Sequence, residues 1–377
     1  MKILEIDKET YKVYGDGLVI HGKLEPAVYT VQFGEMTGFY LKKHAPLTVT
    51  EKLYGQHEAK ISKLVRSYDQ FERPMGVIFS GDKGIGKSIA ARMLCEQMMA
   101  KGLPVIMVEQ NIPGITSFID SIQQECVVLF DEFEKNFKLY GRNDSDDDSN
   151  DNQQDRLLSL FDGTSSNVKR LYIITCNNVT ELSTFLVNRP GRFHYHIRWH
   201  YPTMAEVEEY LKDKVDEKYH DRIPAVLDFS HKVQLNFDCL RAIAFELNLG
   251  EHFEDVIDDL NIKNVENYDC DIHLQLKDGR TFIVQGETID LFQNKKTSRR
   301  LYAATLDNGH RDVVYVRFVP ANITLLNGVM HLDPKTTELI LDSYDSEDKD
   351  ITNMFHKAWV DMKFQDDGYS FGLKKVV

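Results

Sequence analysis

The stretch that decides the fold is Gly-Asp-Lys-Gly-Ile-Gly-Lys-Ser, residues 81–88. It fits the pattern G-x-x-x-x-G-K-[ST], in which glycines let the backbone curl so that its N–H groups point at a polyphosphate. Lys87 can then reach the β- and γ-phosphates, and Ser88 can ligate Mg²⁺. An apolar strand candidate at 76–80 precedes the loop, and a helix candidate beginning near Lys87 adds the positive end of its dipole. The sequence therefore predicts that a nucleoside triphosphate and Mg²⁺ bind against Gly81, Asp82, Lys83, Gly84, Ile85, Gly86, Lys87, Ser88 and Ile89.

A second motif lies at residues 126–132, which read Cys-Val-Val-Leu-Phe-Asp-Glu. A continuous apolar run suits a strand buried on both faces of a parallel sheet. Acidic residues at its carboxyl end would sit where ligands bind in open α/β sheets. We expect Asp131 to hold Mg²⁺, directly or through water, and Glu132 to polarise a water for attack on the γ-phosphate. The alternative, a buried strand followed by an ordinary acidic turn, is weakened by the phosphate loop upstream.

A third strand candidate, residues 170–175, ends in Cys-Asn-Asn at 176–178. A polar side chain at this strand tip, between the first two motifs, could orient the attacking water, and Asn177 is the predicted residue. In isolation the same dipeptide is typical of a strand end that favours a turn.

Three blocks follow in order: Leu-Leu-Ser-Leu-Phe-Asp-Gly at 157–163, Ile-Thr-Cys-Asn at 174–177, and Leu-Val-Asn-Arg-Pro-Gly-Arg-Phe at 186–193. With the loop, they resemble the AAA branch of the AAA+ ATPases, which carries a leucine-rich helix ending in Asp-Gly, a Thr-x-Asn sensor and Arg-Pro-Gly-Arg-Phe. The first block is similar to that of the mitochondrial Rieske-protein translocase type. The resemblance covers residues 45 to 260 and neither flank.

This resemblance implies an α/β fold: a P-loop AAA+ core, in which a parallel sheet carries helices on both faces, followed by a small helical lid. It also implies that the chain hydrolyses ATP to ADP and phosphate in a ring, expected to be a hexamer, with ATP between subunits. Arg189 and Arg192 match the two arginines that AAA proteins insert into the neighbouring subunit's site. There a guanidinium stabilises charge on the transferred phosphoryl group. The alternative is that both arginines are surface residues beside a Pro-Gly turn.

Several positions depart from the family pattern. Residues 82–85 read Asp-Lys-Gly-Ile where many AAA proteins have Pro-Pro-Gly-Thr, which changes the stiffness of the loop. Ile112 stands where protein-threading rings place an aromatic pore residue, so we expect either an aliphatic pore loop or a simple strand–helix connection. Arg241 is either a nucleotide-sensing arginine of the lid or a solvated helix residue. Residues 53–55 lie where AAA+ chains often line the adenine pocket.

Composition narrows the class of protein. The 377 residues suit two or three domains. A formal net charge of −14, from 59 acidic and 45 basic residues, is unfavourable for tight contact with a nucleic-acid backbone. The five cysteines lack metal-site spacing and read as reduced core thiols. Because no apolar run approaches the roughly 20 residues that span a bilayer, and no signal-peptide pattern is present, we expect a cytoplasmic chain without membrane contact.

Pattern changes along the chain predict four parts. Residues 1–47 alternate polar and apolar and predict a β-rich amino-terminal cap, residues 48–201 the ATPase core, and residues 202–262 a helical lid whose first helix is capped by Thr203 with Glu206. Residues 263–377 return to period two and contain Asn-Gly at 327–328, which predicts an antiparallel β domain with a hairpin.

Two charged segments are less informative. Residues 143–155 place acidic side chains near calcium-loop spacing, yet they lack the required glycine and final glutamate, so a self-repelling loop is the better interpretation. The basic cluster, defined as Lys295, Lys296, Arg299 and Arg300, could touch nucleic acid or an acidic partner, or could be an ordinary solvated loop.

Three functions fit these features. The first is a homo-oligomeric ring that remodels a protein partner or adaptor, with the β domains capturing it. The second is a nucleic-acid-associated ATPase for replication or packaging, compatible with a phage origin. The third is a scaffold whose assembly is controlled by nucleotide.

Overall fold

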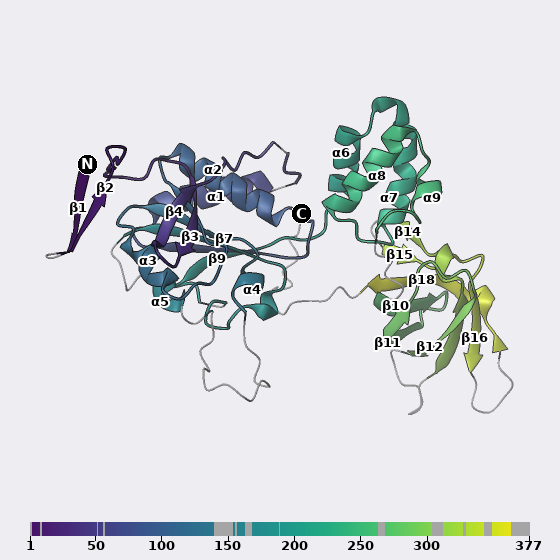
Figure 1. The fold of residues 1–377 in the computed structure, drawn as a ribbon. Helices are drawn as coiled ribbons and strands as arrows, with labels where there is room; N and C mark the ends of the chain where they lie inside the picture. The colour runs from purple at the N-terminus through teal and green to yellow at the C-terminus, as the bar shows by residue number, and fades with distance from the viewer. Residues whose placement is uncertain are drawn as a thin grey trace. The chain divides into compact units, whose positions relative to one another are not determined.

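The computed structural model describes residues 2–7, 10–50, 52–55, 57–138, 154, 157–162, 168–187, 189–262, 268–303, 312–326, 329–342 and 349–362. These fall into two compact units. The first comprises Met1–Pro202 with Asn236–Asp238, and the second comprises Thr203–Leu235 with Cys239–Val377. Figure 1 labels the elements of both.

The first unit is built on a seven-stranded sheet in the order β4-β3-β6-β7-β8-β5-β9. Strands β3, β6, β7, β8, β5 and β9 run parallel, and β4 pairs antiparallel with β3 at the edge. Because β8 lies between β5 and β7, the carboxyl ends of these three strands meet at one point, as the motif order predicted. The bounds are β3 Val28–Gly34, β4 Gly38–Lys43, β5 Met75–Ser80, β6 Val105–Met107, β7 Cys126–Phe130, β8 Arg170–Cys176 and β9 Phe193–Arg198.

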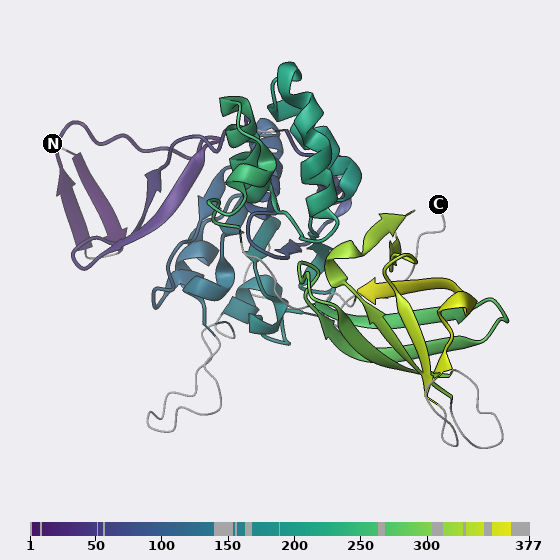
Figure 2. The same ribbon diagram turned by 90° about the vertical axis from the view of Figure 1, so that its right-hand side faces the viewer.

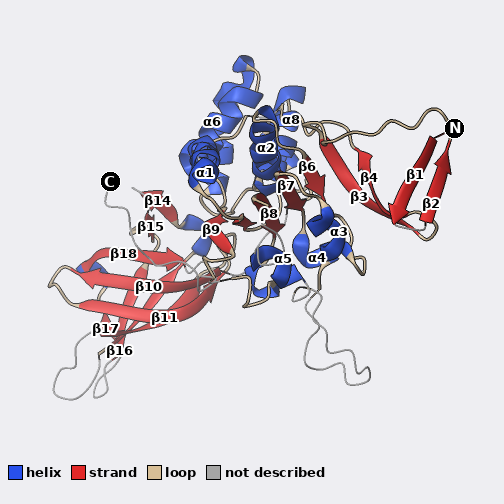
Figure 3. Ribbon diagram, turned by 90° about the vertical axis from the view of Figure 1, so that its left-hand side faces the viewer, coloured by secondary structure: helices blue, strands red, loops and turns tan. Residues whose placement is uncertain are grey.

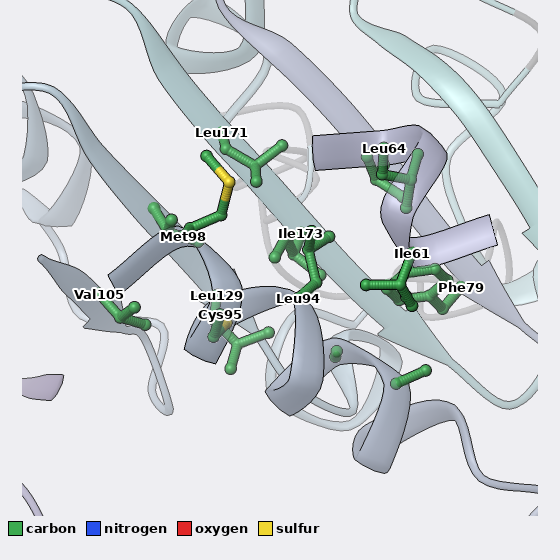
Figure 4. Packing of buried hydrophobic residues seen from close by; sticks show 14 of the residues in the cluster. Ile61, Leu64, Phe79, Leu94, Cys95, Met98, Val105, Leu129, Leu171 and Ile173 are labelled. Carbon is green, nitrogen blue, oxygen red and sulfur yellow. The ribbon is translucent and has the colours of Figure 1, made fainter. Parts of the chain in front are cut away.

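Helices cover both faces of this sheet (Figure 3). On one face, α1 (His57–Gln70) and α2 (Lys87–Ala100) pack Ile61, Leu64 and Leu94 against the strands, as Figure 4 shows. The other face carries α3 (Ile115–Ser121), α4 (Phe133–Asn136) and α5 (Leu158–Asp162). An aromatic cluster fills the space below the central strands; its members are Phe130, Phe133, Phe137, Phe161, Tyr172 and Phe193. The predicted α/β core with helices on both faces is confirmed.

The amino-terminal segment differs from the expected separate cap. Only β1 (Lys2–Asp7) and β2 (Thr10–Tyr14) form a sheet of their own, whereas β3 and β4 extend the central sheet. Alternating sequence specifies a strand and does not specify which sheet it joins, because pairing is a long-range choice. The expected boundary at residue 47 therefore does not coincide with a boundary between the observed units.

The second unit joins a helical cluster to a β-sheet. Helix α6 (Met204–Lys214) begins with the predicted capping box, in which Thr203 and Glu206 bond each other's backbone N–H. Helices α7 (Ile223–Ser230), α8 (Phe237–Leu249, whose first two residues belong to the first unit) and α9 (Phe253–Val256) follow. Lys232 Nζ, just beyond α7, donates to the carbonyl of Ala321 at 3.0 Å, so the cluster and the β part share contacts.

The β part is an antiparallel sheet of nine strands in the order β14-β15-β18-β10-β11-β12-β13-β16-β17. In Figure 2 these strands, green to yellow, form a curved sheet. Alternate side chains of β10, β12 and β13 form its core, which matches the predicted period of two. Strands β14 and β15 pair in the predicted hairpin register, and the turn at 327–328 lies outside the described residues. The bounds are β10 Tyr268–Leu276, β11 Thr281–Ile289, β12 Thr297–Ala303, β13 Val313–Phe318, β14 Thr324–Leu326, β15 Val329–His331, β16 Glu338–Asp342, β17 Lys349–Asp350 and β18 Phe355–Met362.

Three further expectations from the sequence concern the acidic segment, the cysteines and membrane-spanning helices. The acidic segment 143–155 lies outside the described residues apart from Gln154. Burial raises the pKa of Cys126 to about 11 and that of Cys176 to about 12, so these thiols stay protonated as packed core groups. Among the described helices, none combines the length and apolar character that crossing a membrane requires.

Candidate nucleotide site

The phosphate loop joins β5 to α2. Its three glycines have positive φ angles, which other residues rarely adopt. The φ angles are +136° at Gly81, +74° at Gly84 and +95° at Gly86. A side chain on Gly81 would meet the carbonyl oxygen of Trp199 at 2.3 Å, so that glycine is required by packing. At Gly86 a Cβ would meet nothing within 4 Å. The loop is therefore closed against the protein at Gly81 and open at Gly86, immediately before the 14-residue helix α2.

Lys87 lies at the first turn of α2 with only 7% of its surface exposed. Its ammonium donates to the carbonyl of Asp82 at 2.5 Å and to Oδ1 of Asn177 at 3.0 Å. Burial lowers the pKa of Lys87, and the nearby carboxylates Glu134, Asp82 and Asp131 act in the opposite direction. The loop lysine and the predicted water-orienting asparagine are thus already in contact.

The two residues predicted to hold Mg²⁺ also meet. Ser88 Oγ donates to Oδ1 of Asp131 at 3.1 Å. Thr175, at the end of β8, donates its hydroxyl to the same Oδ1 at 2.5 Å and accepts from the backbone N–H of Glu132 at 2.8 Å. Thr175 therefore holds both carboxylate residues of the motif, and its sequence pattern does not distinguish this role from ordinary strand burial.

Glu132 sits in a strained backbone conformation. Its φ of 49° is the only positive value at a non-glycine residue in the described part of the chain. Such outliers persist where surrounding contacts hold them, and they cluster at functional sites. The carboxylate is partly exposed and pairs with Lys135 Nζ at 2.5 Å, a contact that raises the pKa of Lys135. Glu132 follows the carboxyl end of β7, as predicted, and is the neighbour of Asp131, which contacts Ser88 of the loop.

Glu134 was missed by sequence reasoning, which treated it as part of an acidic turn. It lies on α4 and is 8% exposed. Its Oε1 accepts from the backbone N–H of Asn177 at 3.0 Å and from the side-chain Nδ2 of Asn177 at 2.6 Å. A third carboxylate thus belongs to the site, linked to Lys87 through Asn177.

Comparison with known proteins agrees with this geometry. Residues 77–201 match the ATPase family associated with various cellular activities, AAA. Residues 77–201 are therefore an AAA ATPase domain. The chain is also 25% identical over 214 residues to the ATP-dependent zinc metalloprotease FtsH of Mycoplasma genitalium. That match includes 54% of this chain and 29% of the length of FtsH.

Arg189 and Arg192 precede the amino end of β9, whereas the loop follows the carboxyl end of the neighbouring parallel strand β5. The carbonyl of Arg192 is 2.5 Å from the position of a Cβ on Gly76, at the amino end of β5. The loop begins five residues later, about 15 Å away along an extended strand. Arg192 donates to the carbonyl of Phe185 at 2.8 Å, and the exposed Arg189 lies 5.5 Å from the Phe185 ring centroid. The structure therefore does not bring either arginine to the loop of its own chain.

Residues 236–238 contribute contacts to the AAA loop that the sequence did not reveal. The backbone N–H of Phe237 donates to Gly84 O at 2.9 Å, and Asn236 Nδ2 donates to Lys83 O at 3.1 Å. The ring of Tyr54, a buried member of the predicted adenine-pocket segment, stacks on Phe237 with centroids 5.8 Å apart. Tyr54 is thus connected to the loop through Phe237.

The remaining candidates are each described within their own part of the fold. Ile112 is half-buried in the connection before α3, where Phe39 of β4 stacks on Phe118 with centroids 5.1 Å apart. Arg241 is exposed on α8 in the second unit. In the basic cluster, Lys296 pairs with Glu338, Arg299 with Glu287 at 2.7 Å, and Arg300 with Asp342 at 3.6 Å. Three of its four cations therefore face carboxylates, which weakens its interpretation as a nucleic-acid surface.

Proposed function

We propose that the AAA core hydrolyses ATP with Mg²⁺ in a homo-oligomeric ring and that the second unit engages a protein partner. The observation that carries this proposal is the single connected cluster of Lys87, Ser88, Asp131 and Asn177, which joins the phosphate loop to the tips of β7 and β8. The open side of Gly86, the start of a 14-residue helix and a buried ammonium all suit a polyphosphate.

The residues divide the chemistry between them. Lys87 exchanges its bonds to Asp82 and Asn177 for bonds to phosphate oxygens. Ser88 and Asp131 supply hard oxygen ligands, and Mg²⁺ held there neutralises phosphate charge when bound. Glu132 accepts a proton from water as the water oxygen attacks the γ-phosphorus. The bond from that phosphorus to the bridging oxygen breaks, and ADP leaves with the electron pair.

Assembly follows from the arginines. A guanidinium near the transferred phosphoryl group accelerates such reactions by about 10³–10⁵-fold when a neighbour supplies it. The Arg192 backbone lies beside Gly76, about 15 Å along β5 from the loop of its own chain, which fits supply of the arginines in trans. We therefore propose ATP at the interface between subunits, in a ring with six as the expected number.

The partner is proposed to be a protein, contacted through the second unit. The net charge is −14, and three cations of the basic cluster pair with carboxylates of the same chain. Both features are unfavourable for binding a nucleic-acid phosphate backbone. Free cysteines with buried thiols fit a reducing compartment, and we propose the cytoplasm.

The test is steady-state ATPase activity of the wild type and of Glu132→Gln. The wild type should turn over at about 1–10 s⁻¹. Glu132→Gln should lose at least about 100-fold in kcat because the general base is removed, while the Kd for ATP stays within about threefold. Wild-type protein that binds ATP and does not hydrolyse it would contradict the proposal and favour a nucleotide-controlled scaffold.

A further inference from the structure

Glu134 holds Asn177 at two points. One carboxylate oxygen, Oε1, accepts both the backbone N–H at 3.0 Å and the side-chain Nδ2 at 2.6 Å. On the other side of the amide, Oδ1 accepts from the Lys87 ammonium at 3.0 Å. Hydrogen bonds therefore hold the amide of Asn177 between the carboxylate of Glu134 and the ammonium of Lys87.

These partners define which way the amide points. An ionised carboxylate only accepts hydrogen bonds, and an ammonium only donates them. The nitrogen of the amide must then face Glu134, and its oxygen must face Lys87. The orientation of the amide therefore follows from the chemistry of its neighbours.

Glu134 is itself firmly held. It occupies the short helix α4, where the ring of Phe133 stacks on that of Phe137, the residue after the helix, with centroids 4.8 Å apart, and both rings contact Phe130. The residue is 8% exposed, and its second oxygen, Oε2, has no hydrogen-bond partner among the described residues. A buried carboxylate oxygen without a partner is costly, which indicates that this side chain is kept for what Oε1 does.

We propose that Glu134 is a positioning residue for ATP hydrolysis, which keeps the amide oxygen of Asn177 directed at the attacking water. This inference rests on the proposed function. When Lys87 turns to the phosphates, Oδ1 of Asn177 loses its donor. Glu134 still holds Nδ2 and the backbone, so the free Oδ1 remains in place and accepts a hydrogen from the water that Glu132 deprotonates.

The experiment compares Glu134→Gln, Glu134→Ala and Asn177→Ala with the wild type, and uses Glu35→Gln, an exposed site on the β3–β4 turn, as the matched control. Each protein is assayed for kcat, for the Kd of a fluorescent ATP analogue and for Tm. The double variant Glu134→Gln/Asn177→Ala closes a thermodynamic cycle.

Glu134→Gln should lower kcat about tenfold and Glu134→Ala about 100-fold, because misplacement of a positioning group by about 1 Å has effects of that size. The Kd should change less than about threefold, since the loop amides are untouched. In the Asn177→Ala background, Glu134→Gln should have no further effect on kcat. Glu35→Gln should behave as the wild type.

Two results would overturn the inference. One is a Glu134→Gln enzyme with full kcat. The other is a loss in the double variant equal to the product of the single losses, together with a lower Tm, which would show that Glu134 only supports the fold. An inactive wild type would instead refute the proposed ATPase function, so the two failures are distinguishable. Should Glu134→Ala not fold, Glu134→Gln, which preserves shape, decides the question.

Discussion

Lys87 joins the two halves of the site at the scale of single residues. Its burial and its bonds to Asp82 and Asn177 place one cation where three segments converge. Removal of that cation takes away the main charge for a bound triphosphate and leaves Asn177 with one fewer donor.

Lys87→Ala should therefore raise the Kd for ATP by at least about 100-fold, equivalent to about 2.8 kcal/mol at 1.4 kcal/mol per factor of ten. Isothermal titration with ATP and Mg²⁺ measures this. Lys212→Ala, which removes an exposed lysine paired with Glu208 on α6, serves as the control and should bind ATP like the wild type. Equal affinity in Lys87→Ala would show that triphosphate binds elsewhere.

Two glycines of the loop between β5 and α2 have different surroundings. Gly81 is confined by the backbone of Trp199, and Gly86 faces open space. Gly81→Ala should therefore reduce the free energy of unfolding by several kcal/mol, because backbone must shift. Gly86→Ala should cost about 1–2 kcal/mol, the usual penalty of a left-handed alanine.

Urea denaturation of both variants, followed by tryptophan fluorescence, measures this difference. The Gly86→Ala protein should remain folded and lose ATP affinity, since the new methyl enters the open side of the loop. Equal stability of the two variants would contradict the assignment of Gly81 to packing and Gly86 to the ligand.

Elements also show what the sequence could and could not predict. The loop, β7 and β8 were predictable because their signals are local: a glycine pattern, and apolar runs that end in polar residues. The site members Thr175 and Glu134 were not, because a threonine in a strand and a glutamate in a turn carry no distinguishing local signal. The contact of residues 236–238 with Gly84 joins segments about 150 residues apart, and no periodicity encodes such a pairing.

The whole molecule combines a AAA core with a second unit that carries helices and a nine-stranded sheet. Its net charge of −14 and the paired basic cluster predict that nucleic acid does not regulate it. Single-stranded DNA or RNA added at 50 mM and 200 mM salt should leave kcat for ATP unchanged within about twofold. Strong stimulation that disappears at the higher salt would reverse the choice of partner.

We propose that each site takes its loop from one chain and its arginines from another. The most direct measurement mixes two inactive proteins: Lys87→Ala, which keeps Arg189 and Arg192, and the double variant Arg189→Ala/Arg192→Ala, which keeps the loop. Each alone should have less than about 1% of wild-type kcat. After mixing at equal concentration, about a quarter of randomly formed interfaces combine an intact loop with intact arginines, and activity should return to about that fraction. A mixture that stays inactive beside an active wild type, or a double variant that is active alone, would show that the sites are not shared between subunits.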